Sequence, residues 1–273
     1  MKKILLLFDG SHFSEGAFNY ALHISQTQPV LLTGVFLPSV DYTDTMIYYL
    51  GGVSGPLYVP TLDTDSDTME QNAERFKALC TKHHIEHRVH TSISGSIIEG
   101  IKKETRYADV MILSSETFYS NLGKATQEGY LEDTMHKAEC PVIVVPEQYK
   151  MPKSIILAYD GSHASVFAIK QFAYLFPEMQ DLSTVVVYAS EGDGQLPDMP
   201  YIEELAARHF KDLTFFKLEA DPKKYFTTWM TGRGSALLVT GSFGRSGLSE
   251  LFRRNFAEEV IDEHKLPVFI AHP

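Results

Sequence analysis

One segment of the sequence occurs twice. Residues 3–12 read KILLLFDGSH and residues 154–163 read SIILAYDGSH. Farther along each copy, ADVMILSSETF at 108–118 aligns with SALLVTGSFGR at 235–245. Because a strand-like run followed by similar turn residues returns in the same order, we expect one fold to be used twice.

The end of each copy repeats as well, with CPVIVVP at 140–146 and LPVFIAHP at 266–273. A short polar stretch that contains Pro152 separates the copies. The sequence therefore predicts two domains, at 1–147 and 153–273, which suits a chain of 273 residues.

Each copy alternates short apolar runs with segments of helical periodicity. This alternation predicts an α/β fold of two tandem open parallel five-stranded sheets, with helices on both faces of each. The expected strands lie near 3–8, 30–36, 86–91, 109–114 and 141–145, and near 154–159, 183–189, 213–218, 236–240 and 267–271. The expected helices lie near 14–26, 67–83, 96–106, 124–138, 165–176, 199–209, 221–231 and 248–264.

The first copy is longer than the second, mainly through residues 38–66. Three glycines in this stretch, with Pro56 and Pro60, predict a long surface loop. Its four tyrosines leave open a lid over a binding site or an interface patch.

Charge and hydropathy exclude several classes of function. No apolar run approaches the ~20 residues of a membrane span, and the start of the chain lacks the cleavage site of a signal peptide. The net charge of −11 disfavours general binding of nucleic acid. Cys80 and Cys140 are too far apart to suggest a metal pair, so we expect two buried thiols in a cytoplasmic protein.

An Asp-Gly-Ser triplet follows the first strand of each copy, at Asp9 and at Asp160. In an open parallel sheet, ligands lie beyond the carboxyl ends of the strands. A carboxylate there can accept hydrogen bonds from a ribose or from an adenine amino group. The alternative is a turn whose serine caps the next helix, and Ser14 and Ser165 are also well placed for capping.

The apolar run at 237–239 ends at a turn with three glycines, Gly241, Gly244 and Gly247, and a helical pattern follows. Such a turn presents backbone N–H groups and the positive end of a helix dipole at one place, which suits a phosphate. A glycine-rich connection without a ligand is the alternative. Four of the five arginines of the second copy fall in this region, namely Arg233, Arg245, Arg253 and Arg254.

These motifs together resemble the universal stress protein family in its tandem two-domain form. The resemblance rests on Asp-Gly-Ser after the first strand, VTGSFGRSGLSELF after the fourth, and the final LPVFIAH, and it covers essentially the whole chain. It implies two domains of the adenine-nucleotide α-hydrolase type, related by a pseudo-two-fold axis. It also implies that the last strands, 141–145 and 267–271, pair with each other.

The ATP-binding branch of that family carries the signature Gly-x2-Gly-x9-Gly-Ser/Thr. Gly241 and Gly244 fit this signature, whereas Arg254 and Asn255 stand in place of its closing pair. The resemblance implies that ATP or AMP binds in the second domain, with Mg²⁺ accompanying ATP. The site residues that it implies are Tyr159, Asp160 and Ala189 around the adenosine, and Thr240, Gly241, Phe243, Gly244, Arg254, Asn255 and Phe256 around the ribose and phosphates.

The first copy departs further from the signature. Ser114, Glu116 and Thr117 occupy the positions of Gly241, Phe243 and Gly244. The Glu116 carboxylate opposes a phosphate by like charge, and the missing glycines block its close approach. We therefore expect that the first copy does not bind ATP through this site.

The resemblance implies a stress-response regulator whose binding of an unidentified protein partner depends on the bound adenine nucleotide. The net charge and the lack of a long apolar run argue against nucleic acid and membrane as partners, and a homodimer is left open. A slow ATP hydrolase is one alternative, although neither a general base nor a pair of Mg²⁺ ligands is evident beside the glycine turn. A binding module for a non-nucleotide ligand, with both nucleotide sites degenerate, is the other. On this basis no catalytic residue and no resident metal are expected.

A histidine-rich segment at 82–90 includes the pattern H-x-x-E-H, which holds zinc when it lies within a helix. Here Ile85, His87 and Val89 alternate with Glu86 and Arg88, which favours a strand that leaves the end of a helix. Zinc binding is therefore the less favoured interpretation.

Overall fold

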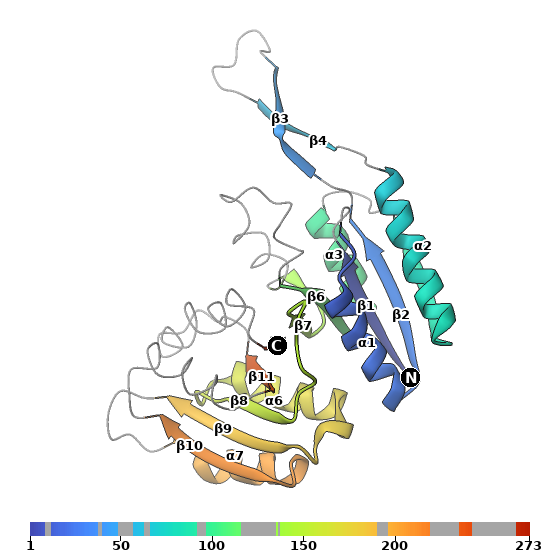
Figure 1. The fold of residues 1–273 in the computed structure, drawn as a ribbon. Coiled ribbons are helices and arrows are strands. Elements are labelled where there is room, and N and C mark those ends of the chain that lie inside the picture. The colour runs from blue at the N-terminus through green and yellow to red at the C-terminus, as the bar shows by residue number, and fades with distance from the viewer. Residues whose placement is uncertain are drawn as a thin grey trace.

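The computed structural model describes residues 1–8, 12–37, 40–48, 57–62, 66–91, 97–115, 135, 137–189, 196–218, 235–241 and 266–273. In this part of the chain, ten strands form one large sheet and two strands form a separate pair. Helices lie along both faces of the large sheet (Figure 1).

The strands of the large sheet have the order β10-β9-β8-β11-β12-β7-β6-β1-β2-β5. Each predicted strand is present, and no strand end differs by more than one residue from the prediction. The first half, 1–147, contributes β1 (Lys2–Phe8), β2 (Val30–Phe36), β5 (Glu86–His90), β6 (Val110–Ser114) and β7 (Val142–Val145). The second half, 153–273, contributes β8 (Ser154–Ala158), β9 (Ser183–Ala189), β10 (Leu213–Leu218), β11 (Ala236–Gly241) and β12 (Val268–Ala271).

The two halves meet at the centre of the sheet. Neighbouring strands within each half are parallel, whereas β12 and β7 are antiparallel, with Val268 opposite Val144. This confirms the predicted pairing of the last strands, which merges the two expected sheets into one. Because the two halves meet through the antiparallel pair β12 and β7, their strands run in opposite directions. The carboxyl ends of the strands of one half therefore lie on the opposite side of the sheet from those of the other half.

Side chains along each strand alternate between two hydrophobic cores, one on each face of the sheet. Leu6 of β1 belongs to a core that also contains side chains of α1 (Glu15–Thr27), α2 (Ser66–Lys82), α6 (His163–Leu175) and α7 (Met199–His209). Leu5 and Leu7 belong to the opposite core, on the side of α3 (Ile97–Arg106). Each core contains strand residues of both halves.

Serine side chains cap the first helix of each half, but at different positions. Ser14 Oγ accepts a hydrogen bond from the Ala17 amide at 3.0 Å, and Ser162 Oγ accepts one from the Ser165 amide at 3.2 Å. Ser162, and not Ser165, is therefore the cap of α6. Ser165 is the residue that aligns with Ser14, but α6 begins one helical turn before the position that aligns with the start of α1.

The segment expected to be a loop contains two strands, β3 (Val40–Tyr48) and β4 (Leu57–Leu62), which pair antiparallel with each other. The prediction of a long surface loop was wrong where these two strands lie, because β-branched and aromatic residues around the glycines favour extended backbone. Figure 1 shows this hairpin beyond the first half, at the opposite end of the molecule from β10. The expected helices at 221–231 and 248–264, and most of the one at 124–138, lie outside the described residues.

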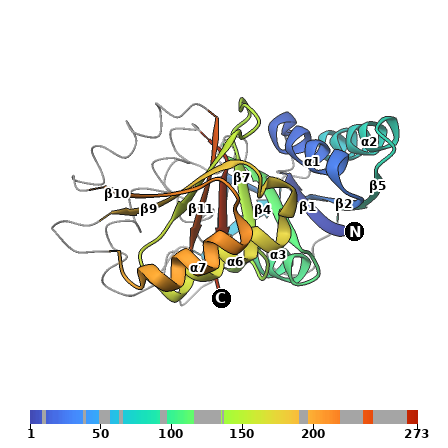
Figure 2. The same cartoon turned by 90° about the horizontal axis from the view of Figure 1, so that it is seen from below.

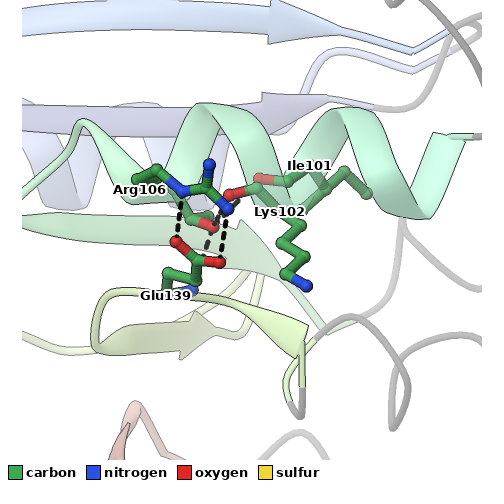
Figure 3. A network of polar contacts seen from close by, with 5 residues as sticks. Ile101, Lys102, Arg106 and Glu139 are labelled. Carbon is green, nitrogen blue, oxygen red and sulfur yellow. Dashed lines mark hydrogen bonds and ion pairs between the residues drawn. The ribbon is translucent and has the colours of Figure 1, made fainter.

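A polar network fixes the segment that precedes β7 to the end of α3 (Figure 3). The Arg106 guanidinium donates two hydrogen bonds to the Glu139 carboxylate, at 2.6 and 2.8 Å. The Thr105 hydroxyl accepts a hydrogen bond from the Glu139 amide at 3.0 Å and also contacts the Ile101 carbonyl oxygen at 2.9 Å. Because Thr105 is fully buried, its bonds act in a site that water does not reach.

Side chains also connect the two halves beside the central strands. Lys2 Nζ lies 4.6 Å from the centre of the Phe176 ring and 3.9 Å from Glu178 Oε1. Gln28 donates a hydrogen bond to the same carboxylate oxygen at 2.9 Å. No helix in the described residues is long and apolar enough to cross a bilayer.

Candidate functional site

A candidate site lies at the carboxyl end of β8. This strand pairs with β9 on one side and with β11 on the other. The chain therefore leaves β8 and β11 in different directions. Open α/β sheets bind their ligands at the point between two strands where this change of direction occurs. The residues that follow or end these strands include Asp160, Ala189 and Gly241.

Asp160, Gly161 and Ser162 form a tight turn after β8. Asp160 Oδ1 accepts a hydrogen bond from the Ser162 amide at 2.9 Å, which uses one of the two carboxylate oxygens. Gly161 has a φ of +78°, a conformation that favours glycine. A Cβ atom on Gly161 would also lie 2.7 Å from Cγ of Pro197. The turn therefore requires both its carboxylate and its glycine for structural reasons.

Tyr159 immediately precedes this turn and is buried. Its hydroxyl donates a hydrogen bond to the Pro197 carbonyl oxygen at 2.8 Å. Burial raises the pKa of the phenol, and the nearby carboxylates of Asp198 and Asp160 raise it further. Asp198 has a φ of +50° and precedes α7 directly. Residues 197 and 198 thus lie beside the turn, and no sequence pattern had indicated this contact.

Gly241 ends β11 against the first turn of α6. A Cβ atom at this position would lie 2.5 Å from the carbonyl carbon of Ala164 and 2.7 Å from the amide nitrogen of Ser165. Thr240 Oγ1 donates a hydrogen bond to the Gly241 carbonyl oxygen at 3.2 Å. A glycine is therefore required at 241 by helix packing, whether or not a phosphate approaches.

The structure brings together those predicted site residues that it describes. Two of them follow β8 directly, and the others lie at the ends of the neighbouring strands β9 and β11. The described ones are Tyr159, Asp160, Ala189, Thr240 and Gly241, of which Ala189 is described by its backbone alone. The remaining predictions, which lie outside the described residues, are Phe243, Gly244, Arg254, Asn255 and Phe256.

The corresponding part of the first half is filled with aromatic rings. Phe8, which aligns with Tyr159, stacks on Phe13 and Phe36 with ring centres 4.9 and 4.8 Å away. In the second half, Ala164 aligns with Phe13, and the pairing of β9 with β8 places Tyr188 at the position of Phe36. The first half therefore has one aromatic ring more than the second here, with Phe13 in place of Ala164. Glu116 and Thr117 of the first half lie outside the described residues.

The first half also neutralises the start of α1 with its own carboxylate. Glu147 Oε2 accepts a hydrogen bond from the Gly16 amide at 2.9 Å. A Cβ atom on Gly16 would lie 2.5 Å from the Pro146 carbonyl oxygen. An anionic ligand at this helix start would meet the negative charge of Glu147.

The histidine-rich segment is a helix end, a turn and a strand, as its pattern indicated. The helix α2 ends at Lys82, His84 has a φ of +56°, and β5 begins at Glu86. His90 Nδ1 lies 2.9 Å from Glu104 Oε1 of α3. Within the described ranges, no three His, Cys, Asp or Glu side chains lie together as a metal site would require.

Comparison with known proteins supports the fold. No model of a known family matches the chain, and no curated protein does. A solved structure of a universal stress protein from Archaeoglobus fulgidus DSM 4304 is similar over 99% of this chain and 96% of its own, with a TM-score of 0.68 at 17% identity. The chain has a universal stress protein fold. Because this structure covers both halves, the likeness extends over the whole doubled architecture.

Two smaller solved proteins are also similar. A universal stress family protein from Burkholderia pseudomallei covers 53% of this chain with 96% of its own, at 16% identity and a TM-score of 0.33. A second universal stress protein from Archaeoglobus fulgidus covers 53% with 97% of its own, at 17% identity and a TM-score of 0.36.

Proposed function

We propose that this chain is a cytoplasmic stress-response regulator of the universal stress protein family, which binds an adenine nucleotide in its second half. The observation that carries the proposal is the meeting of Asp160, Thr240 and Gly241 around the end of β8. This is the place at which open α/β sheets take ligands, and the glycine-rich sequence with its arginines follows directly on Gly241.

Each of these residues has a defined role in the proposal. The Asp160 carboxylate accepts a hydrogen bond from a ribose hydroxyl or from the adenine amino group. Thr240 and Gly241 begin the turn whose backbone amides hold the phosphates, and Arg254 adds a charge that suits a phosphate. The nucleotide is ATP or AMP, with Mg²⁺ accompanying ATP, and its binding controls the contact with a protein partner.

The first half has a structural role in this proposal. Its Phe13 ring stacks on Phe8 where the second half has Ala164, and Glu147 lies at the start of α1. Both features oppose the binding of adenosine and phosphate there. We therefore expect one nucleotide for each chain.

Mass spectrometry of nucleotide that remains bound through purification tests the proposal directly. One equivalent of ATP or AMP supports it. A purified chain that carries no nucleotide, and that shows no heat of binding when either nucleotide is titrated into it, contradicts it. ADP bound to chain that was supplied with ATP would instead favour slow hydrolysis.

A titration with ATP then locates the site through a matched pair of variants. Gly244→Glu places a carboxylate in the glycine turn, and Thr117→Glu places the same charge at the aligned position of the first half. We expect Gly244→Glu to abolish measurable binding by like-charge repulsion and loss of close approach. Thr117→Glu should leave the affinity unchanged. Equal affinity in both variants would remove the assignment to the second half.

A further inference from the structure

A hollow separates α2 from β5 at one edge of the large sheet. Its volume is about 620 Å³, and Figure 2 shows β5 and α2 together on the outer side of the first half. We call it the α2–β5 groove. It is lined by Met69, Glu70, Ala73, Glu74 and Lys77 of α2, and by His87, Arg88, Val89 and Thr91 of β5 and the residue after it.

One wall of this groove is a sheet edge. The strand β5 pairs with β2 along Glu86–His90 and stands last in the strand order. In the described part of the chain, no strand pairs with its other side. An edge strand of this kind presents N–H and C=O groups to which another extended segment can pair.

The side chains in the groove suit a strand whose residues alternate. Met69 and Val89 are partly buried and pack against the core that underlies α2, and Ala73 belongs to that core. These residues give the groove an apolar floor. An added strand would place every second side chain on this floor and the intervening ones toward solvent.

The charges of the groove define the partner further. Glu74 pairs with Lys77 at 2.6 Å, and Arg88 lies 3.6 Å from Glu86. Glu70 is exposed, and none of the described residues forms an ion pair with it. The chain as a whole carries a net charge of −11. The groove therefore favours a basic side chain opposite Glu70.

We propose that the α2–β5 groove binds an extended basic segment of a partner protein as an added strand alongside β5. The backbone of β5 supplies the pairing, the apolar floor takes alternate side chains, and Glu70 pairs with a lysine or arginine. A second copy of this chain is the other occupant that the edge admits. It would bring two acidic chains together, which like-charge repulsion opposes.

A fluorescein-labelled peptide of seven residues, alternating lysine and valine with blocked ends, tests this proposal by fluorescence anisotropy at physiological salt. Glu70→Lys and Glu203→Lys make the same change of charge at the fifth residue of α2 and of α7. We expect Glu70→Lys to weaken binding roughly fivefold, because it replaces an exposed ion pair with a repulsion between like charges. Glu203→Lys should change the affinity little. Equal weakening by both variants would show non-specific attraction and overturn the proposal.

A second probe tests the pairing of backbones. The same peptide with methylated backbone nitrogens cannot donate to β5, so it should bind at least ~10-fold more weakly. Equal binding of the methylated peptide, or no binding of either peptide at millimolar concentration, would overturn the proposal. Sedimentation velocity distinguishes the other occupant, because a dimer that the peptide dissociates would show that a second copy fills the groove.

Discussion

Gly241 of β11 and Ala164 of α6 lie in backbone-to-backbone contact. A Cβ atom at 241 would lie 2.5 Å from the Ala164 carbonyl carbon and 2.7 Å from its oxygen. Ala164 belongs to the extra first turn of α6, which α1 lacks. The aligned residue of the first half is Ser114, which does carry a Cβ. The glycine at 241 is thus explained by the earlier start of α6.

We expect Gly241→Ala to destabilise the chain by about 1–3 kcal/mol, because the new methyl group meets main-chain atoms that cannot move independently. Gly34→Ala is the matched control, since its Cβ would meet only side-chain atoms of Phe36 and Phe76 at 3.0 and 3.1 Å. These contacts are longer than the 2.5 and 2.7 Å contacts at 241, so the loss should be smaller. Urea unfolding of both variants measures the difference. A Gly241→Ala protein as stable as the wild type would contradict the close contact.

Tyr159→Phe tests the contact between the turn after β8 and Pro197. The substitution removes the hydroxyl that donates to the Pro197 carbonyl oxygen at 2.8 Å and keeps the buried ring. We expect the free energy of unfolding to fall by about 0.5–1.5 kcal/mol, the usual value of such a hydrogen bond. Tyr201→Phe, at a side chain that is 74% exposed, should have no effect. If both variants unfold at the same urea concentration, the hydrogen bond contributes nothing.

The sequence predicted the sheet well because its strands are short apolar runs between polar turns. Leu6 and Leu113, for example, lie in runs too short for helices and too apolar for a solvated loop. Such runs become parallel strands buried on both faces, and here they pair in register within one half. The repeat then predicted how the second half would be arranged.

Contacts between distant turns could not be predicted in the same way. Nothing in the residues around Pro197 indicates that its carbonyl oxygen accepts a hydrogen bond from Tyr159. The start of α6 was ambiguous for a different reason, because Ser162 and Ser165 both favour a helix cap and only packing decides between them. The β3–β4 hairpin was missed because its glycines and prolines outweighed the β-branched residues beside them.

Thr105→Val tests the network between α3 and the segment before β7. The valine keeps the shape of the side chain but leaves the Glu139 amide without the oxygen that it reaches at 3.0 Å. We expect a loss of about 0.5–1.5 kcal/mol in the free energy of unfolding, the usual value of a hydrogen bond that is partly buried. Thr81→Val is the control, since Thr81 is exposed and donates only to the Lys77 carbonyl oxygen of its own helix. Similar losses in the two variants would mean that the network does not stabilise the fold.

The two buried thiols predict how stability depends on alkaline pH. Burial raises the pKa of Cys80 and of Cys140 to about 12, whereas an unfolded thiol has a pKa of about 8.5. The folded chain therefore keeps a proton that the unfolded chain releases. The stabilising contribution is complete below the unfolded pKa and is lost as the pH rises toward the folded one.

We expect each thiol to lower the free energy of unfolding by about 1.4 kcal/mol for every pH unit above the unfolded pKa. Urea unfolding at pH 8 and pH 10.5 measures this loss, and a variant with Cys80→Ala and Cys140→Ala is the control. Its stability should fall less between the two pH values, because no thiol ionises on unfolding. A thiol reagent at pH 8 should label the wild type only after unfolding, since both cysteines are free and buried. Rapid labelling of the folded chain, or the same pH dependence in both proteins, would contradict the burial of the thiols.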